Sequence, residues 1–326
     1  MARSGPIWIT WESQRRNREI ARALAMPLYE WSHVDRLRPR IFKYVVGIAK
    51  TLRLLLRERP RLVICQNPSI VLSAGLVAVK LMCGLHVFVD AHNVGLFPAG
   101  GRSRLLMLVS RWVQRHADMT IVTNDGLKAK VEATGGRSFV LPDPIPAAPE
   151  TSIQRLKGST NVLLICTYAD DEPYEVVFEA FRALGPETVL YVTGNPEKLG
   201  GRKLRLPENV ILTGFLPEED YWSALRAVDV AIDLTTRDDC LVCGAYEAAA
   251  VGTPMVLSDT AALRAFFDRG AIFSAHSPEA LSAAVREATS RGEQLRRDLG
   301  PWRDRRNAEW EVLRSRLRRE IDARLG

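Results

Sequence analysis

The sequence lacks an apolar run long enough to cross a membrane. Its most apolar stretch, Ile70 to Leu85, is shorter than the roughly 20 residues of a spanning helix and contains Lys80, so we expect a buried helix there. The first residues have no continuous apolar segment of the kind found in signal peptides and run directly into charged residues. We therefore expect a cytoplasmic protein.

Cysteine is also scarce, with 5 among 326 residues. An odd number scattered through apolar segments argues against a disulfide framework and for a reducing compartment. Cys240 and Cys243 form a Cys-x-x-Cys pair, but neither a second pair nor a nearby histidine completes four zinc ligands. A thioredoxin-type redox pair is disfavoured because that motif belongs near the start of a small βαβ domain. We expect no metal ion and interpret both thiols as small apolar residues beside a ligand-binding loop.

Positive charge is concentrated in the first half of the chain. Residues 1–150 contain 22 Lys and Arg against 11 Asp and Glu, whereas the net charge of the whole chain is +7. The densest basic stretch, Arg36 to Arg61, also has apolar residues at helical spacing. This pattern is typical of an amphipathic helix at an anionic membrane surface, and equally of a core helix with a solvated basic face. No interleaving of aromatic and basic residues accompanies the charge, which argues against a nucleic-acid partner.

Short apolar strands alternate with helical segments along the chain. We predict strands at Pro6–Trp11, Arg61–Gln66, His86–His92, Met119–Thr123, Ser138–Leu141, Asn161–Cys166, Thr188–Thr193, Asn209–Thr213, Val228–Leu234 and Thr253–Leu257. Such alternation is typical of parallel sheets covered by helices on both faces. The fold class expected is α/β, with two doubly wound, Rossmann-like domains that face a cleft.

The domain boundaries follow from composition. A proline-rich segment, Leu141 to Thr160, predicts an interdomain linker. We expect an N-terminal acceptor-binding domain at residues 1–150 and a C-terminal nucleotide-sugar-binding domain at residues 151–305. Residues 306–326 are expected to form a helix that packs back toward the N-terminal domain. The anchors that we predict for the charged C-terminal region are Trp302, Trp310 and Leu313.

Several loops after predicted strands of the second half carry candidate ligand-binding residues. In open α/β sheets, ligands bind beyond the carboxyl ends of the strands. One strand ends in Gly194, the next in Gly214 and Phe215, and a third in a polar loop that contains Arg237. We expect these four residues to line a donor site.

The stretch from Arg237 to Pro254 combines acids, thiols and a glycine directly before an alanine-rich helix. At the start of that helix, the backbone N–H groups of Gly244, Ala245 and Tyr246 are expected to point at a phosphate, which the helix dipole favours. Glu247, in the first turn, either complements the dipole or accepts hydrogen bonds from a ribose.

The same region carries a resemblance to a known family. The segment from Thr213 to Asp259 is similar to the nucleotide-sugar-binding half of GT-B glycosyltransferases of the family 4 type. That family has an acid, seven residues and then Glu before an alanine-rich helix, and Asp239 and Glu247 stand at this spacing. The resemblance implies that Asp239 binds donor-sugar hydroxyls near the reacting carbon and that Glu247 holds the ribose. It extends more weakly over the first half through VDAHN (89–93), ADMTIVTND (117–125) and VLPDPIP (140–146).

One loop departs from that family. Residues 166–172 are acidic where family 4 enzymes carry Gly, Arg and Lys, the basic pair that clamps the diphosphate. The acidic loop is more similar to that of the lipid-linked β-mannosyltransferases, which invert configuration. Positive charge is then expected from Arg237, Arg264, Arg15 or Arg16, although each is also readily explained as a surface charge.

The loop after the first strand is a second departure, because it holds bulky polar residues in place of glycines. We expect Gln14, Arg15 and Asn93 to bind the acceptor, since loops at this edge of the sheet shape a ligand pocket. Deprotonation of an acceptor hydroxyl requires a base within hydrogen-bond reach.

The candidate bases are Asp90, His92 and Glu12. His92 is favoured because a neutral imidazole suits proton transfer near pH 7. Its alternative is a loop histidine bonded to backbone, and the alternative for Glu12 is a cap on the following helix.

These observations predict a metal-independent GT-B glycosyltransferase of the hexosyltransferase type, with catalytic residues Asp239, His92 and Glu12. The co-substrate expected is a UDP or GDP sugar with no other cofactor. The acceptor is expected to be a lipid-linked glycan intermediate of surface polysaccharide synthesis, with the protein peripheral to the inner face of the plasma membrane. Two alternatives are a GT-B sugar-nucleotide epimerase and a non-catalytic sugar-nucleotide-binding scaffold at the membrane.

Overall fold

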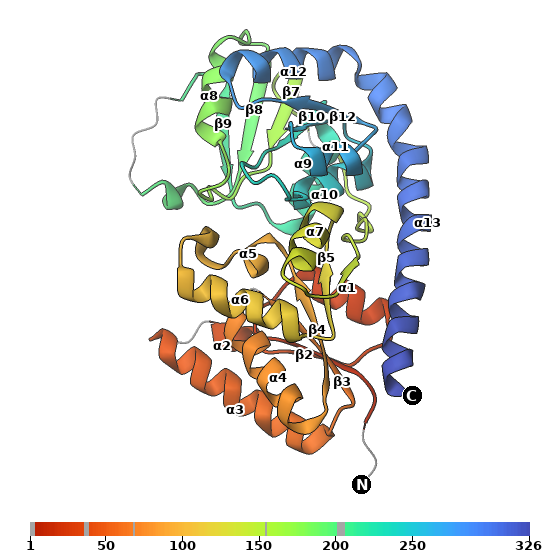
Figure 1. Cartoon of the computed structure of the whole chain (residues 1–326). Helices are drawn as coiled ribbons and strands as arrows, with labels where there is room; N and C mark the ends of the chain where they lie inside the picture. Colours follow the sequence, from red (N-terminus) through yellow and green to blue (C-terminus); the bar gives the residue numbers. More distant parts are fainter. Residues whose placement is uncertain (1–3, 36–38, 68, 154, 201–205) are drawn as a thin grey trace. The chain divides into compact units, whose positions relative to one another are not determined.

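The computed structural model describes residues 4–35, 39–67, 69–153, 155–200 and 206–326. The first three residues of the predicted basic stretch, Arg36 to Arg38, lie outside the described residues. The chain divides into two compact units, one of Met1–Pro144 with Ala308–Gly326 and the other of Ile145–Asn307. Each unit contains one six-stranded sheet (Figure 1). All of the described strand pairings are parallel, which confirms the predicted α/β class.

The sheet of the N-terminal unit has the strand order β2-β1-β3-β4-β5-β6. Its strands are β1 (Ile7–Thr10), β2 (Leu28–Glu30), β3 (Leu62–Asn67), β4 (His86–Ala91), β5 (Met119–Val122) and β6 (Ser138–Val140). Its helices are α1 (Arg15–Ala23), α2 (Ser32–Asp35), α3 (Arg40–Glu58), α4 (Ile70–Cys83), α5 (Asn93–Leu96), α6 (Arg104–His116) and α7 (Asp125–Ala133), with a 3-10 turn, η1 (Pro98–Gly101). Because the connections after β1 and β3 leave in opposite directions, the switch point of this sheet lies between those two strands.

Alternate residues of the central strands face opposite helical layers, as expected of strands buried on both sides. Ile7 and Ile9 belong to a core formed with α3, α4, α6 and α7, whereas Trp8 belongs to a core formed with α1 and the end of α13 (Gly292–Leu325). Figure 1 shows α3, α4 and α6 on one side of this sheet and α1 with the end of α13 on the other.

The sheet of the C-terminal unit has the strand order β12-β11-β10-β7-β8-β9. Its strands are β7 (Thr160–Leu164), β8 (Thr188–Thr193), β9 (Val210–Gly214), β10 (Val230–Asp233), β11 (Met255–Ser258) and β12 (Ala271–Ser274). The helices are α8 (Tyr174–Arg182), α9 (Glu218–Ala227), α10 (Cys243–Val251), α11 (Ala261–Phe266), α12 (Pro278–Ser290) and the first part of α13, with a 3-10 turn, η2 (Pro196–Leu199). Helices α8 and α12 cover one face of the sheet, and α9, α10 and α11 cover the other. The switch point lies between β7 and β10.

Two strands were not predicted from the sequence, and both lie at sheet edges. β2 has 3 residues and β12 has 4, and each pairs with a single neighbour. Each segment is a strand because it pairs with one inner strand of its sheet.

The most apolar run of the sequence forms α4, which is buried on one face only, so the expectation of a buried helix holds in part. Leu72 and Leu76 are buried, but Leu81 and Met82 near the helix end are 59% and 82% exposed. No helix within the described residues has both the length and the apolar character needed to span a membrane.

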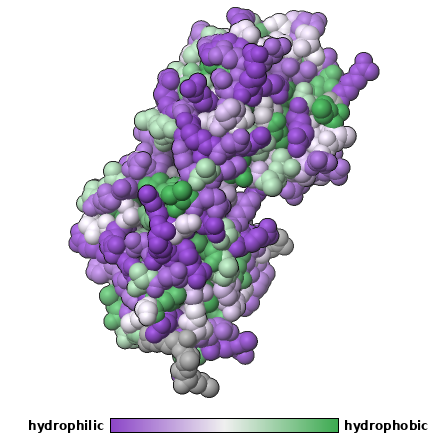
Figure 2. Space-filling model, turned by 90° about the vertical axis from the view of Figure 1, so that its right-hand side faces the viewer, coloured by the Kyte–Doolittle hydropathy of each residue, from purple (hydrophilic) through white to green (hydrophobic). Residues whose placement is uncertain are grey.

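The predicted anchors of the C-terminal helix are confirmed. Trp302 is 2% exposed and stacks on Phe267, while Trp310 is 9% exposed and Leu313 packs against the same core as Trp310. The outer face of α13 is charged, and Figure 2, which views the molecule from the side of α13, shows a mostly hydrophilic surface with apolar residues in small groups.

We predict that Trp302→Ala lowers the free energy of unfolding of the C-terminal unit by about 3–5 kcal/mol, because a buried indole is replaced by a cavity. Its Nε1–H also loses the carbonyl oxygen of Phe266 as an acceptor. Urea denaturation followed by circular dichroism measures the change. Val312→Ala, at a 53% exposed position of the same helix, serves as control and should change stability by less than about 0.5 kcal/mol. Equal effects of the two substitutions would contradict the assignment of Trp302 as an anchor.

Candidate active site

The loops that follow β7 and β10 meet at the switch point of the C-terminal sheet. Asp171, in the loop after β7, forms an ion pair with Arg237 of the loop after β10, with 3.0 Å between Oδ1 and Nη2. The Thr235 hydroxyl donates to the other carboxylate oxygen of Asp171 at 2.9 Å. Arg237, predicted as a cation for the diphosphate, is therefore already paired, although its side chain remains 38% exposed.

The acidic loop after β7 is organised around Glu172. Its carboxylate accepts hydrogen bonds from the backbone N–H groups of Thr167 and Ala169, at 2.8 and 3.0 Å, and from the Thr167 hydroxyl at 2.9 Å. Glu172 thus stabilises a turn made by its own loop. Among the described residues, Lys198 of η2 also contacts this loop. Its Nζ donates to the carbonyl oxygen of Thr167 at 3.0 Å. Sequence reasoning did not single out Lys198.

The start of α10 differs from its prediction, because a carboxylate of the protein occupies it. The backbone N–H groups of Gly244 and Ala245 donate to Asp233, the last residue of β10. Burial raises the pKa of Asp233 well above its usual value, and the nearby Glu172 and Glu247 raise it further. A Cβ on residue 244 would lie 2.6 Å from the Asp233 carboxylate, so this close approach requires glycine.

The expectation that Gly244, Ala245 and Tyr246 present their N–H groups to a phosphate is therefore corrected for Gly244 and Ala245, whose N–H groups are used by Asp233. For Tyr246 it stays a prediction. The Tyr246 side chain is 2% exposed and packs against Phe266 and Phe267 in the core.

The two acids of the family 4 spacing lie on either side of the α10 start. Asp239 is half-buried in the loop before α10, and Glu247 is half-buried in the helix itself. The Tyr221 hydroxyl of α9 donates to Glu247 Oε2 at 2.5 Å. Burial raises the pKa of Tyr221 well above its usual value, and the adjacent Glu247 raises it further, so Tyr221 stays a hydrogen-bond donor. This contact fixes the orientation of the Glu247 carboxylate.

The glycines predicted to line the donor site have different structural roles. Gly194, after β8, has φ of +95°, and a Cβ there would overlap with the carbonyl oxygen of Cys166. It therefore allows two strand ends to approach closely. Gly214, at the end of β9, has φ of +75° with no such contact among the described residues, and it turns the chain into Phe215, which is 84% exposed.

In the N-terminal unit, a buried arginine joins three segments at the carboxyl edge of the sheet. Arg16 of α1 is 5% exposed and forms a bidentate pair with Asp90 of β4, at 2.8 and 3.0 Å. It also donates to Asp143 at 2.6 Å and to the carbonyl oxygen of Leu141 at 2.8 Å. Burial lowers the pKa of Arg16, but Asp90 and Asp143 outweigh that effect and raise it.

This network corrects two expectations. Arg16 is committed to buried carboxylates and is unavailable as a cation for a diphosphate. Asp90 is fully buried and bonded through both oxygens to Arg16, so it is unsuited to take a proton from an acceptor. Arg264 is paired with Asp259, with 2.5 Å between Nε and Oδ1, and Arg15 is paired with Glu19 at 2.7 Å.

His92 lies beside this network, immediately before α5. Its Nε2 is buried, is 3.8 Å from Asp90 Oδ2 and has no hydrogen-bond partner among the described residues. Burial lowers the pKa of His92, and the charge of Arg16 lowers it further. The imidazole is therefore neutral near pH 7 and retains the ability to accept a proton.

The other predicted acceptor residues surround the ends of β1 and β4. Glu12 Oε1 lies 3.7 Å from Nζ of Lys43 in α3. Gln14, and not Glu12, occupies the cap position of α1, which corrects the capping alternative for Glu12. Asn93 begins α5 and is half-buried next to His92.

Sequence reasoning missed a cluster of buried amides at the switch point of this sheet. Gln66 Oε1 accepts from the Thr10 hydroxyl at 2.8 Å and from Asn17 at 2.6 Å. Asn17 Oδ1, Gln66 Nε2 and Asn67 Oδ1 are buried without a hydrogen-bond partner among the described residues. The available signal was the polar pair Gln66-Asn67 at the carboxyl end of an otherwise apolar strand.

We predict that Asp143→Asn lowers the free energy of unfolding by about 2 kcal/mol at pH 7, because Arg16 loses a charge-assisted bond. Burial raises the pKa of Asp143, but the charge and the hydrogen bond of Arg16 outweigh it, so the net pKa lies below its usual value. The stabilisation is therefore complete above about pH 4, the usual pKa of the unfolded carboxyl, and is lost as pH falls below it. Urea denaturation at pH 7, 5 and 3.5 should show the difference between wild type and variant shrinking only at pH 3.5.

The control for this measurement is Asp220→Asn, at an exposed position of α9. Its difference from wild type should remain small at every pH, as for most surface substitutions. A difference between wild type and Asp143→Asn that is constant down to pH 3.5 would refute the stabilising ion pair.

Comparison with known proteins identifies the family of both units. The profile of the family "Glycosyl transferase 4-like domain" matches residues 9–142, and that of "Glycosyl transferases group 1" matches residues 153–301. No curated protein matches the chain in sequence at a significant level.

Solved structures with the same fold cover nearly the whole chain. Sucrose-phosphate synthase from Thermosynechococcus elongatus has a TM-score of 0.78 at 14% identity, covering 98% of this chain and 100% of its own. HepE from Anabaena, in complex with UDP and glucose, has a TM-score of 0.70 at 10% identity, covering 98% and 99%. A putative UDP-N-acetylglucosamine 2-epimerase from Listeria monocytogenes has a TM-score of 0.61 at 14% identity, covering 99% and 97%.

The two family matches account for both sheets, and the solved structures share the fold of the whole chain. Two six-stranded parallel sheets with helices on both faces form the architecture on which these matches agree. The chain therefore has the GT-B fold, and it matches the glycosyl transferase 4-like domain in its first unit and the group 1 glycosyl transferases in its second.

Proposed function

We propose that the protein transfers a hexose from a UDP or GDP sugar to a lipid-linked glycan acceptor in surface polysaccharide synthesis, without a metal ion. The observation that carries the proposal is the arrangement at the switch point of the group 1 domain. There the Arg237–Asp171 pair joins the loops after β7 and β10, directly before the helix that bears Glu247. Ligands of open α/β sheets bind at such switch points.

The donor would be held by residues of the C-terminal unit. Glu247, oriented by Tyr221, accepts hydrogen bonds from the ribose, and Asp239 binds hydroxyls of the transferred sugar. Phe215 offers an exposed aromatic face to the base. HepE, a solved structure of the same fold, was determined in complex with UDP-glucose, which supports a nucleotide sugar as donor.

The departing diphosphate requires positive charge, because negative charge develops on it as the glycosidic bond breaks. Arg237, which contacts Asp171, and Lys198, which contacts Thr167, would supply it beside the acidic loop. Both side chains are at least partly exposed, so they can reorient toward a bound ligand. Asp171 would then serve as the partner of Arg237 in the absence of the donor, and two side-chain cations would make a metal ion unnecessary.

His92 would act as the general base for the acceptor hydroxyl. Its lowered pKa and buried Nε2 distinguish it from Asp90, which is bonded to Arg16, and from Glu12, which is close to Lys43. A base on the acceptor is required for an inverting reaction. Inversion also agrees with the similarity of the acidic loop to that of lipid-linked β-mannosyltransferases.

A lipid-linked acceptor and a peripheral membrane location are supported by α3. This helix carries six apolar residues that are at least 41% exposed, namely Ile41, Phe42, Val45, Ile48, Leu52 and Leu56. It also has five basic residues and one acidic residue. Exposed apolar residues beside basic ones suit the surface of an anionic membrane.

We predict that one of UDP, GDP and dTDP binds the protein in the presence of EDTA, as measured by calorimetric titration. Glu247→Gln should weaken that binding about tenfold, because an amide replaces one carboxylate acceptor of the ribose while the other oxygen still accepts from Tyr221. Glu219→Gln, an exposed position of α9, should leave the affinity unchanged. Failure of all three nucleotides to bind would overturn the donor site.

We predict that Asp239→Asn and His92→Ala each lower kcat for sugar transfer by about 100-fold or more, while the affinity for the nucleotide diphosphate stays within threefold. Release of the nucleotide diphosphate from its sugar, measured with membrane extract as acceptor, gives the rate. A non-catalytic scaffold would show no turnover in the wild type. An epimerase would instead produce a second sugar nucleotide without any acceptor.

A further inference from the structure

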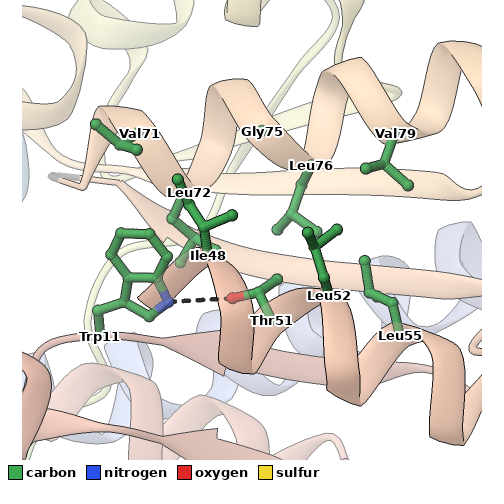
Figure 3. A pocket seen from close by; sticks show the side chains of 10 residues that line it. All are labelled: Trp11, Ile48, Thr51, Leu52, Leu55, Val71, Leu72, Gly75, Leu76 and Val79. Atoms are coloured by element: carbon green, nitrogen blue, oxygen red, sulfur yellow. Dashed lines mark hydrogen bonds between the residues drawn. The ribbon is translucent and has the colours of Figure 1, made fainter. Parts of the chain in front are cut away.

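An apolar groove runs between α3 and α4 in the N-terminal unit (Figure 3). Side chains of the two helices face each other across it, and the hollow between them has a volume of about 40 Å³ and opens to solvent. It is lined by Trp11, Ile48, Thr51, Leu52, Leu55, Val71, Leu72, Gly75, Leu76 and Val79. Apart from Thr51 and Gly75, every lining residue is a large hydrophobic one, so the groove suits a hydrocarbon and not a polar ligand.

The polar atoms of this groove are already satisfied. The Trp11 indole N–H donates to the Thr51 hydroxyl at 3.2 Å, and that hydroxyl donates to the carbonyl oxygen of Gly47 at 2.8 Å. A Cβ on Gly47 would lie 2.7 Å from the Trp11 ring, so glycine lets α3 pack directly on the indole. Trp11 is thereby fixed at one end of the groove, with its ring presented to the space between the helices.

Gly75 helps to keep the groove open because it has no side chain to fill the space. It lies in the middle of α4, where glycine costs about 1 kcal/mol relative to alanine. Its φ is not in the left-handed region, and no heavy atom of the described residues outside its own helix turn lies within 4 Å of the place of its Cβ. Neither backbone strain nor a close approach therefore requires glycine here. Gly75 is exposed, and without a side chain it leaves open the α4 rim of the groove that Ile48 and Leu52 of α3 also line.

One end of the groove lies next to candidate acceptor residues. Trp11 follows β1 and directly precedes Glu12, which lies near Lys43 of α3. At the outer rim, Ile48 and Leu52 line the groove and are 41% and 44% exposed, and the same face of α3 continues to Leu56, which is 76% exposed. The groove thus connects the loop after β1 with the exposed apolar face of α3.

The charge around this face indicates which hydrocarbon it fits. Basic residues of α3 outnumber acidic ones by five to one. Lys43 lies beside Glu12 at the Trp11 end of the groove, and Arg53 and Arg57 are exposed next to Leu52 and Leu56 at the outer rim. An uncharged alkyl partner would gain nothing from these cations. A hydrocarbon chain that carries a phosphate is complementary both to the groove and to its basic rim.

We propose that the groove between α3 and α4 binds the hydrocarbon chain of a phosphate-bearing lipid acceptor, with Trp11 at the end nearest the acceptor loop. The identification of this lipid as the acceptor rests on the proposed function. The hydrocarbon-binding site itself rests only on the geometry of the groove. Each of the two statements, the hydrocarbon site and the acceptor role, can therefore be refuted without the other.

The test measures binding of dodecyl phosphate, below its micelle concentration, by calorimetric titration of the full chain. Gly75→Leu should fill the groove from α4 and weaken binding at least tenfold. Because leucine has a higher helix propensity than glycine and its Cβ has free space, the variant should unfold at a temperature no lower than the wild type. Gly75→Ala adds one methyl group and should keep the affinity within about twofold.

The position of the bound hydrocarbon is tested by fluorescence. Dodecyl phosphate brominated on the chain should quench part of the tryptophan emission of the wild type, and that part should be missing in Trp11→Phe and in Gly75→Leu. Inorganic phosphate should neither bind with comparable affinity nor quench. As a control for unspecific adsorption to exposed apolar residues, Leu105→Ser, at a 71% exposed position of α6, should not change the affinity.

Three results would overturn the proposal. The first is no binding of dodecyl phosphate to the wild type, and the second is equal binding to wild type and Gly75→Leu. The third is sedimentation showing a wild-type dimer that Gly75→Leu converts to monomer, because the groove would then be an interface between copies of the chain. Nucleotide titration of Gly75→Leu should match the wild type. If no nucleotide binds but the groove still binds dodecyl phosphate, the proposed function is refuted and the hydrocarbon-binding site is supported.

Discussion

The N-terminal unit depends on one buried guanidinium. Arg16 ties α1 to the end of β4 and to the segment after β6, and it is balanced by Asp90 and Asp143. Removing one partner of such a network leaves an uncompensated charge away from water, which is far more costly than the loss of a surface pair. The same network acts on His92: burial lowers the pKa of the imidazole, the Arg16 charge lowers it further, and Asp90 and Asp143 only partly offset this. Structure and candidate catalysis are thus coupled through a single side chain.

The C-terminal unit contains a cluster of acidic side chains near the start of α10. Asp233, Glu172 and Glu247 lie close enough to raise the pKa of Asp233, and each is held by donors from the protein. Asp233 uses two N–H groups at the start of α10, Glu172 uses those of its own loop, and Glu247 uses Tyr221. The N–H groups of Gly244 and Ala245 are therefore committed to Asp233, and the cations Arg237 and Lys198 contact the loop after β7.

The sequence predicted the α/β class and the inner strands, because continuous apolar runs separated by helical periodicity are a strong local signal. It missed β2 and β12, whose few residues become strands only by pairing with a neighbour. The spacing of Asp239 and Glu247 placed them correctly before and within α10, since that relation is local along the chain. The role predicted for Gly244 and Ala245 was wrong because no local sequence signal indicates that Asp233, eleven residues before Gly244, accepts hydrogen bonds from their N–H groups.

By itself, the sequence determined which residue types stand at the ends of which strands, and with them the family. Tertiary structure decided which polar side chains are committed to each other and which remain able to act. Arg16 and Asp143 are 127 positions apart, and only the parallel sheet brings the ends of their segments to one edge. The groove beside Gly75 has the same origin, because free space between two helices is a property of their packing and leaves no trace in the periodicity of either one.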